Sequence, residues 1–103
     1  MATLTITGSN NNYSVSSDPM NVPNGGELTI IVPVGPPVGC LVCLNKDLGT
    51  TKSHLLGANK TFDMKTYPVG TTWTYTIWDP DTANCPAQIK DNPPHTIVIT
   101  SGM

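Results

Sequence analysis

Three cysteines, Cys40, Cys43 and Cys85, carry the side chains best suited to covalent chemistry in this sequence. A disulfide from Cys40 or Cys43 to Cys85 would close a loop of about 42 to 45 residues and leave one buried thiol. Such a bond forms in oxidising compartments and would favour a periplasmic or secreted protein. In a reducing compartment, all three cysteines are expected as buried thiols.

The cysteines and histidines do not form a recognisable catalytic motif. Cys40 and Cys43 have the Cys-x-x-Cys spacing of redox and zinc sites, but they fall in a predicted strand. Residues i and i+3 of a strand point to opposite faces, so these thiols should diverge. The two histidines, His54 and His95, have no acid at a spacing that suggests a general-base pair. We therefore expect a protein that is not an enzyme.

A polar loop, predicted from residue 79 to residue 94, contains several oxygen-bearing side chains. Its carboxylates and amides are Asp79, Asp81, Asn84, Asp91 and Asn92. Such oxygens suit calcium, and Asp79-Pro80-Asp81 resembles half of a calcium loop. Asp and Asn also favour turns because they bond to nearby backbone groups. No cofactor is expected from this loop unless calcium binds there.

The strand before this loop carries two tryptophans that should face opposite ways. Trp73 and Trp78 are five residues apart, and side chains alternate along a strand. We expect Trp73 in the core and Trp78 on the outside. An exposed Trp78 beside Asp79, Asp81 and Asn84 would suit a carbohydrate ligand or a protein partner, including another copy of the chain. The alternative is that the loop itself covers Trp78.

Composition narrows the classes of function. Only 12% of the residues are charged, against a usual share of about 25%. The net charge is −2, with five Lys plus Arg, so nucleic-acid binding is not expected. No apolar run approaches the roughly 20 residues that span a bilayer. The first residues lack the basic and apolar regions of a signal peptide, so none is expected here.

Alternating apolar and hydroxyl-bearing residues predict strands and no helix. We expect about seven strands in one antiparallel β-sandwich domain, residues 1–103. The segments expected to be extended are 3–7, 13–17, 27–32, 38–44, 61–65, 72–78 and 95–100.

The order of these features resembles that of the cupredoxins, the small blue-copper sandwich proteins. The segments that carry the resemblance are Tyr13–Pro19, Val22–Ile30, Leu44–Asp47 with His54, Gly70–Tyr75 and His95–Ile99. They cover most of the chain, although each motif is loose. The resemblance implies an antiparallel Greek-key β-sandwich that is cupredoxin-like, and an immunoglobulin-like sandwich is the alternative. A fold alone does not assign a function.

The copper motif of that family is not intact. A type 1 site needs two imidazoles, a thiolate and a weak axial ligand such as Met. Ile77 stands where the resemblance places the thiolate, and Met103 lies past the last strand. A relocated copper site would use His54, Cys85 and His95.

Three functions follow as hypotheses. The first is a non-enzymatic binding or interaction module whose contact surface includes Trp78 and the loop at residues 79–94. The second is a copper-binding electron-transfer or copper-carrier protein. The third is a self-assembling structural subunit that pairs through exposed sheet edges, which the low charge would favour.

Overall fold

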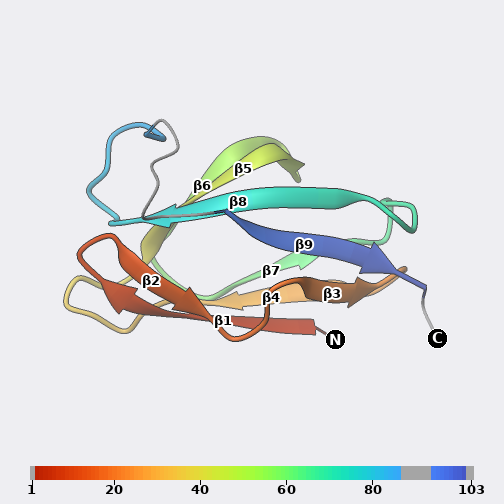
Figure 1. Cartoon of the computed structure of the whole chain (residues 1–103), viewed down its shortest axis with the longest axis horizontal. Coiled ribbons are helices and arrows are strands. Elements are labelled where there is room, and N and C mark those ends of the chain that lie inside the picture. The colour runs from red at the N-terminus through yellow and green to blue at the C-terminus, as the bar shows by residue number, and fades with distance from the viewer. Residues whose placement is uncertain (1, 87–93, 102–103) are drawn as a thin grey trace.

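The computed structural model describes residues 2–86 and 94–101, which form nine β-strands and no helix (Figure 1). The described part of the chain therefore has no helix that could cross a membrane. The strands are β1 (Ala2–Ser9), β2 (Asn12–Val15), β3 (Met20–Pro23), β4 (Glu27–Ile31), β5 (Cys40–Leu48), β6 (Thr51–Leu56), β7 (Lys60–Asp63), β8 (Thr72–Trp78) and β9 (His95–Thr100).

These strands form two sheets that pack as layers. The order is β2-β1-β4-β7 in the four-stranded sheet and β3-β9-β8-β5-β6 in the five-stranded sheet. Figure 1 shows the five-stranded sheet lying over the four-stranded one. The expected all-β, two-layer architecture is confirmed, while the expected number of about seven strands is too low.

The expectation of purely antiparallel sheets is wrong. β1 runs parallel to β4, with Ala2 opposite Leu28, and β3 runs parallel to β9, with Met20 opposite Ile97. The chain enters the other sheet at β3 and returns at β4, so β4 comes back beside β1 in the same direction. Each sheet is therefore mixed.

Two strands, β3 and β6, were not among the predicted segments. β3 has only four residues, ends at Pro23 and pairs with a strand far along the chain, so it has no local signal. β6 begins with the polar residues Thr51, Lys52 and Ser53, which are typical of a loop. It is nevertheless a strand, because it forms a hairpin with β5 at the edge of the sheet.

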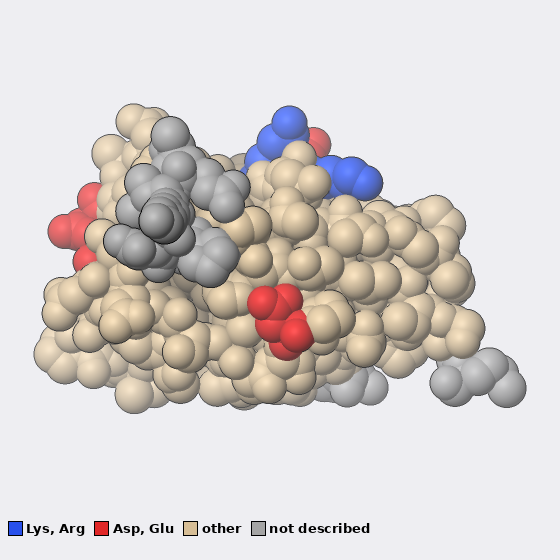
Figure 2. All heavy atoms as spheres, in the orientation of Figure 1, with Lys and Arg blue, Asp and Glu red and all other residues tan. Residues whose placement is uncertain are grey.

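The core fills the space between the sheets. Leu4 and Ile6 of β1 are buried there, and so is Trp73 of β8, as the alternation predicts. The inward residues of the other strands are likewise almost fully buried, among them Val22, Leu28, Ile30, Val42, Tyr75, Ile77, Ile97 and Ile99. Alternate residues of these strands point outward, and charged groups are sparse on the face drawn in Figure 2. The core is thus one continuous cluster between two layers.

Truncation of a core leucine should be far more costly than truncation of an exposed one. Leu28 is 0% exposed and Leu55 is 63% exposed. We expect Leu28→Ala to lower the free energy of unfolding by about 2 to 5 kcal/mol, through lost transfer energy and a residual cavity. The matched control, Leu55→Ala, should change it by less than about 0.5 kcal/mol. Urea denaturation measures both, and equal effects would contradict this packing.

Candidate functional site

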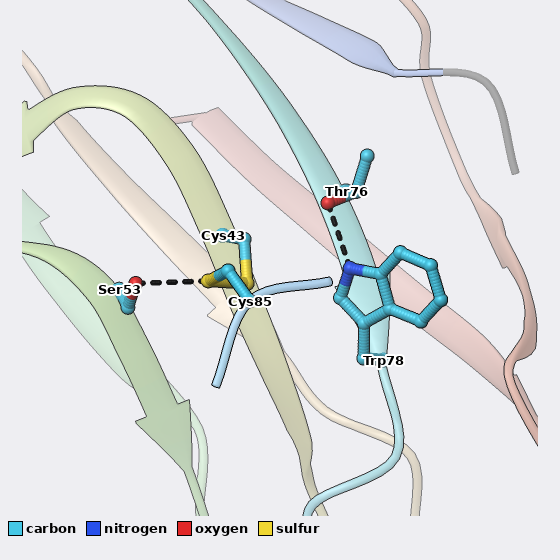
Figure 3. The surroundings of a disulfide bond; sticks show 5 residues. All are labelled: Cys43, Ser53, Thr76, Trp78 and Cys85. Carbon is cyan, nitrogen blue, oxygen red and sulfur yellow. Dashed lines mark hydrogen bonds between the residues drawn. A yellow bond between two sulfur atoms is a disulfide. The ribbon is translucent and has the colours of Figure 1, made fainter. Parts of the chain in front are cut away.

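A disulfide joins the five-stranded sheet to the loop after β8. Cys43 of β5 is bonded to Cys85, and the two Cα atoms are 6.0 Å apart. Figure 3 shows Cys85 lying over β5, with the Ser53 hydroxyl of β6 3.0 Å from its sulfur. Closing this 42-residue separation adds on the order of 4 kcal/mol to stability in the chain-entropy model. The expected bond to Cys85 is confirmed, and Cys43 is the partner.

The third cysteine, Cys40, is a buried free thiol in the core. Cys40 and Cys43 diverge, as expected for positions i and i+3 of a strand, and only Cys43 reaches the outer face. Burial raises the pKa of the Cys40 thiol to about 12. Cys40 is therefore an inert core residue, and the pair does not act as a Cys-x-x-Cys site.

A shallow depression of about 190 Å³, which we call the sheet–loop hollow, lies beside the disulfide. Its floor comes from two paired strands and its rim from the loop. The residues that line it are Cys43, Leu44 and Asn45 of β5, Thr74, Tyr75 and Thr76 of β8, and Pro86 and Pro94 of the loop. None of these lining residues carries a charged side chain.

Two hydrogen bonds fix the polar groups on this floor. The Thr74 backbone N–H donates to Asn45 Oδ1 at 2.8 Å. The Trp78 indole N–H donates to Thr76 Oγ1 at 2.8 Å, as Figure 3 shows. Because a backbone N–H can only donate, the Asn45 amide must turn its oxygen toward Thr74. The floor thus has defined donor and acceptor positions.

Trp78 is on the predicted side of the sheet, but it is not exposed. Its bond to Thr76 places it on the outer face, opposite Trp73, and Leu41 is its partner on β5. Only 3% of Trp78 is accessible, and 6% of Leu41. The expectation of an exposed tryptophan that stacks on a ligand is therefore wrong, because its ring is covered and its N–H is used within the chain.

Asp79 bonds to the turn between β1 and β2 and is not free for a ligand. Its Oδ1 accepts the Tyr13 hydroxyl at 2.6 Å and the Asn11 backbone N–H at 3.0 Å. The Asp79 backbone N–H in turn donates to Asn11 Oδ1 at 2.7 Å. Asn10 and Asn11 have φ of 55° and 58°, a left-handed conformation that asparagine tolerates. Asp79 thus ties the two sheets together at this end.

The hydrogen bonds also shift the pKa values of this pair. The Tyr13 hydroxyl, followed by the backbone N–H groups, holds the pKa of Asp79 below its usual range. Burial, together with the nearby Asp79 carboxylate, raises the pKa of Tyr13. The pair is therefore a phenol that donates to an ionised carboxylate at neutral pH.

The other predicted loop residues do not gather into a metal site in the described part of the chain. Asp81 and Asn84 are exposed, while Asp91 and Asn92 lie outside the described residues. No group of three or more His, Cys, Asp or Glu that could hold a metal occurs among residues 2–86 and 94–101. Asp79, as shown above, is engaged with Tyr13.

The structure does not bring His54, Cys85 and His95 together. His54 pairs with Val42 on edge strand β6, whereas His95 begins β9, three strand spacings or roughly 14 Å away across the sheet. The Cys85 sulfur is bonded to Cys43 and is not a thiolate. Copper binding by these three residues thus has no support in the geometry, and Ile77 is a core residue.

Each histidine has a structural setting of its own. His54 faces the core and packs edge-on against Phe62, with ring centroids 5.1 Å apart. Burial, and secondly Lys60, lowers the pKa of His54. His95 is partly exposed, and its Nδ1 lies 3.0 Å from Asp18 Oδ2. The Thr96 backbone N–H donates to the other oxygen of Asp18.

Asp18 is thus an acid beside His95 that the sequence reasoning missed. The two residues are 77 positions apart and meet because β3 runs parallel to β9. Asp18 precedes a proline at a turn, which is its only local signal. Without β3, its position beside the start of β9 could not be foreseen.

Thiol counting should distinguish the three cysteines. We expect no reaction with a thiol reagent in the native protein, because Cys40 is 0% exposed and its pKa is raised to about 12. One thiol should react in denaturant, and three after reduction. The measurement is absorbance of the released chromophore with Ellman's reagent. Three reactive thiols without reduction would contradict the disulfide.

Replacement of Asp79 should give a pH-dependent loss of stability. Because the folded-state pKa of Asp79 is lowered, its contribution is full above the ordinary carboxyl pKa and is lost as pH falls through the lowered value. We expect Asp79→Asn to cost about 1 kcal/mol at neutral pH and progressively less in acid. The matched control is Asp81→Asn, at an exposed position. Urea denaturation across pH tests this, and a cost for Asp79→Asn that stays constant into acid would contradict it.

Comparison of the sequence with protein-family models and with curated proteins, and of the chain with solved structures, gave no match.

Proposed function

We propose that this protein is a non-enzymatic binding module on a cupredoxin-like Greek-key sandwich. Its contact surface is the sheet–loop hollow, together with the described loop residues from Asp79 to Pro86 that border it. This revises the surface expected from the sequence, because the buried Trp78 supports the floor of the hollow from the side, through its bond to Thr76, and does not contact the ligand.

The observation that carries the proposal is the way the hollow is built. A loop rich in proline and polar residues is bonded covalently to the outer face of a sheet, and its Pro86 borders the depression. A loop held by a rigid scaffold is a common place for binding residues. The disulfide and the Trp78–Thr76 bond restrain both sides of the hollow. Ligand binding would therefore lose little conformational entropy of the protein.

The chemistry of the lining supports binding over catalysis. The eight lining residues contribute hydroxyl, amide, aliphatic and proline groups and one disulfide sulfur. These groups can orient a ligand through hydrogen bonds. Among the described lining residues there is no histidine, carboxylate or free thiol, the groups that would suit general acid–base or nucleophilic chemistry.

The mixed sheets support the cupredoxin-like alternative over the immunoglobulin-like one. Immunoglobulin domains pair their strands in two antiparallel sheets. Here β1 is parallel to β4 and β3 is parallel to β9. We therefore favour the cupredoxin-like arrangement for the scaffold.

The disulfide also bears on where the protein works. Its sulfur atoms are near the surface, since Cys85 is exposed and Cys43 is half-buried. A bond of this kind persists in oxidising compartments. We propose a periplasmic or secreted location on this ground.

Backbone amide shifts in an NMR titration test the binding site. Panels of neutral saccharides, organic acids, amines and short peptides are added to the ¹⁵N-labelled protein. We expect at least one class to shift the amides of Cys43–Asn45 and Thr74–Thr76 together. Filling the hollow with Thr74→Tyr should weaken that binding at least about tenfold, through steric exclusion.

The control for this experiment is Thr3→Tyr, at an exposed position on the four-stranded sheet. It adds the same ring away from the hollow and should leave binding unchanged. Shifts that cluster elsewhere, or a ligand that binds Thr74→Tyr as tightly as the original protein, would contradict the proposal.

A further inference from the structure

Several side chains that line the sheet–loop hollow have hydrogen-bond donors without a partner in the described part of the chain. Asn45 Oδ1 already accepts the Thr74 N–H, which leaves the Asn45 Nδ2 hydrogens without a partner among the described residues. Thr76 Oγ1 already accepts the Trp78 N–H, which leaves its own hydrogen to donate. The Thr74 hydroxyl has no partner among the described residues and can both donate and accept. A ligand that offers several acceptors, such as one with several hydroxyl groups, would therefore suit the hollow.

The arrangement of these three groups suits acceptors on a small ring. Thr74 and Thr76 point the same way from one strand, about 6.7 Å apart, because alternate residues share a face. Asn45 lies on the neighbouring strand, one step beyond the Leu44–Tyr75 pair. Adjacent strands are about 4.8 Å apart. The donors thus form a small triangle that could reach oxygens on different sides of one sugar ring.

The rim adds an apolar contribution. Pro86 and Pro94 are both exposed and border the hollow with their rings. A sugar ring has apolar C–H groups that can pack against such surfaces while its hydroxyls meet the floor. The volume of about 190 Å³ leaves room for a small ligand and not for a large one.

Charge decides between classes of sugar. The described lining residues offer no cation to pair with a carboxylate and no anion to pair with an ammonium group. A charged ligand would lose hydration in the hollow without gaining a partner. The hollow should therefore discriminate against acidic and basic sugars.

We propose that the sheet–loop hollow binds a neutral monosaccharide unit, free or at the end of a glycan, through Asn45, Thr74 and Thr76. This inference rests on the proposed function and names its ligand class. Its recognition is by hydrogen-bond donors and proline rings, since the buried Trp78 cannot stack on a sugar. Trp78 is a positioning residue that orients the Thr76 hydroxyl.

The test compares neutral and charged sugars on the intact, oxidised protein. Methyl glucoside, methyl galactoside, methyl mannoside and N-acetylglucosamine are titrated, with glucuronate and glucosamine as charged counterparts, and amide shifts give the dissociation constants. We expect at least one neutral sugar to shift the hollow amides and to bind about ten times more tightly than either charged sugar.

Two variants probe the donors without removing a structural bond. Asn45→Asp keeps an oxygen for the Thr74 N–H but replaces the free donor with a second oxygen, and should weaken binding at least about tenfold. Thr74→Val removes one hydroxyl and should weaken it about three- to tenfold. Thr3→Val, on the other sheet, is the matched control and should have no effect. Thermal unfolding checks that each variant is folded.

The outcomes separate this inference from the proposed function. If organic acids, amines or peptides shift the hollow amides and no neutral sugar does, the ligand class is wrong and the binding site stands. If no panel member shifts those amides, both are overturned. Tighter binding of glucuronate than of the neutral sugars, or unchanged binding by Asn45→Asp, would also overturn the inference.

Discussion

Strand β8 buries its inner side chains in the core and, at its last residue, also a tryptophan on its outer face, and this constraint governs the rest of the structure. Trp73, Tyr75 and Ile77 point into the core, where each is at most 1% exposed. Trp78 is buried on the opposite face. Aromatic side chains of this size dominate the burial energy of a small domain, so β8 has little freedom to shift in register. Its neighbours β5 and β9 are positioned by that fixed strand.

The proposed site is a consequence of this rigidity. An outer sheet face is ordinarily flat, and a flat face offers no concave surface for a small ligand. The hollow exists because the chain after β8 returns over that face and is bonded to β5 through Cys43. The same strand that anchors the core therefore supplies part of the floor, where Thr76 is held by its bond with the buried Trp78 on the same outer face.

Much of this architecture could be predicted from period-two alternation, because strands with one buried face carry that signal in their own residues. β1, β4, β8 and β9 are examples, and so is the opposite orientation of Trp73 and Trp78. The alternation says which face a residue occupies. It does not say what covers that face, and for this reason Trp78 was expected to be exposed.

Features that depend on distant partners could not be predicted in this way. β3 is too short to show periodicity, and its pairing with β9 brings Asp18 beside His95. The choice of Cys43 over Cys40 followed from a face assignment within β5, which the sequence left open. The hollow itself depends on where the loop returns to the sheet. In the sequence, only Cys85 indicated this position, as a candidate for a disulfide to β5.

The pairing of β3 with β9 has a consequence for when the molecule can complete its fold. Asp18 and His95 are separated by 77 positions, and among the described strands β3 pairs only with β9. During synthesis, the backbone groups of β3 therefore cannot form these pairs until β9 has left the ribosome. Pairings of such long sequence separation slow folding, because the entropy of closing the chain is lost before the contacts form. The five-stranded sheet is therefore completed only after β9 has been synthesised, and until then the unpaired edge of β3 is open to other chains.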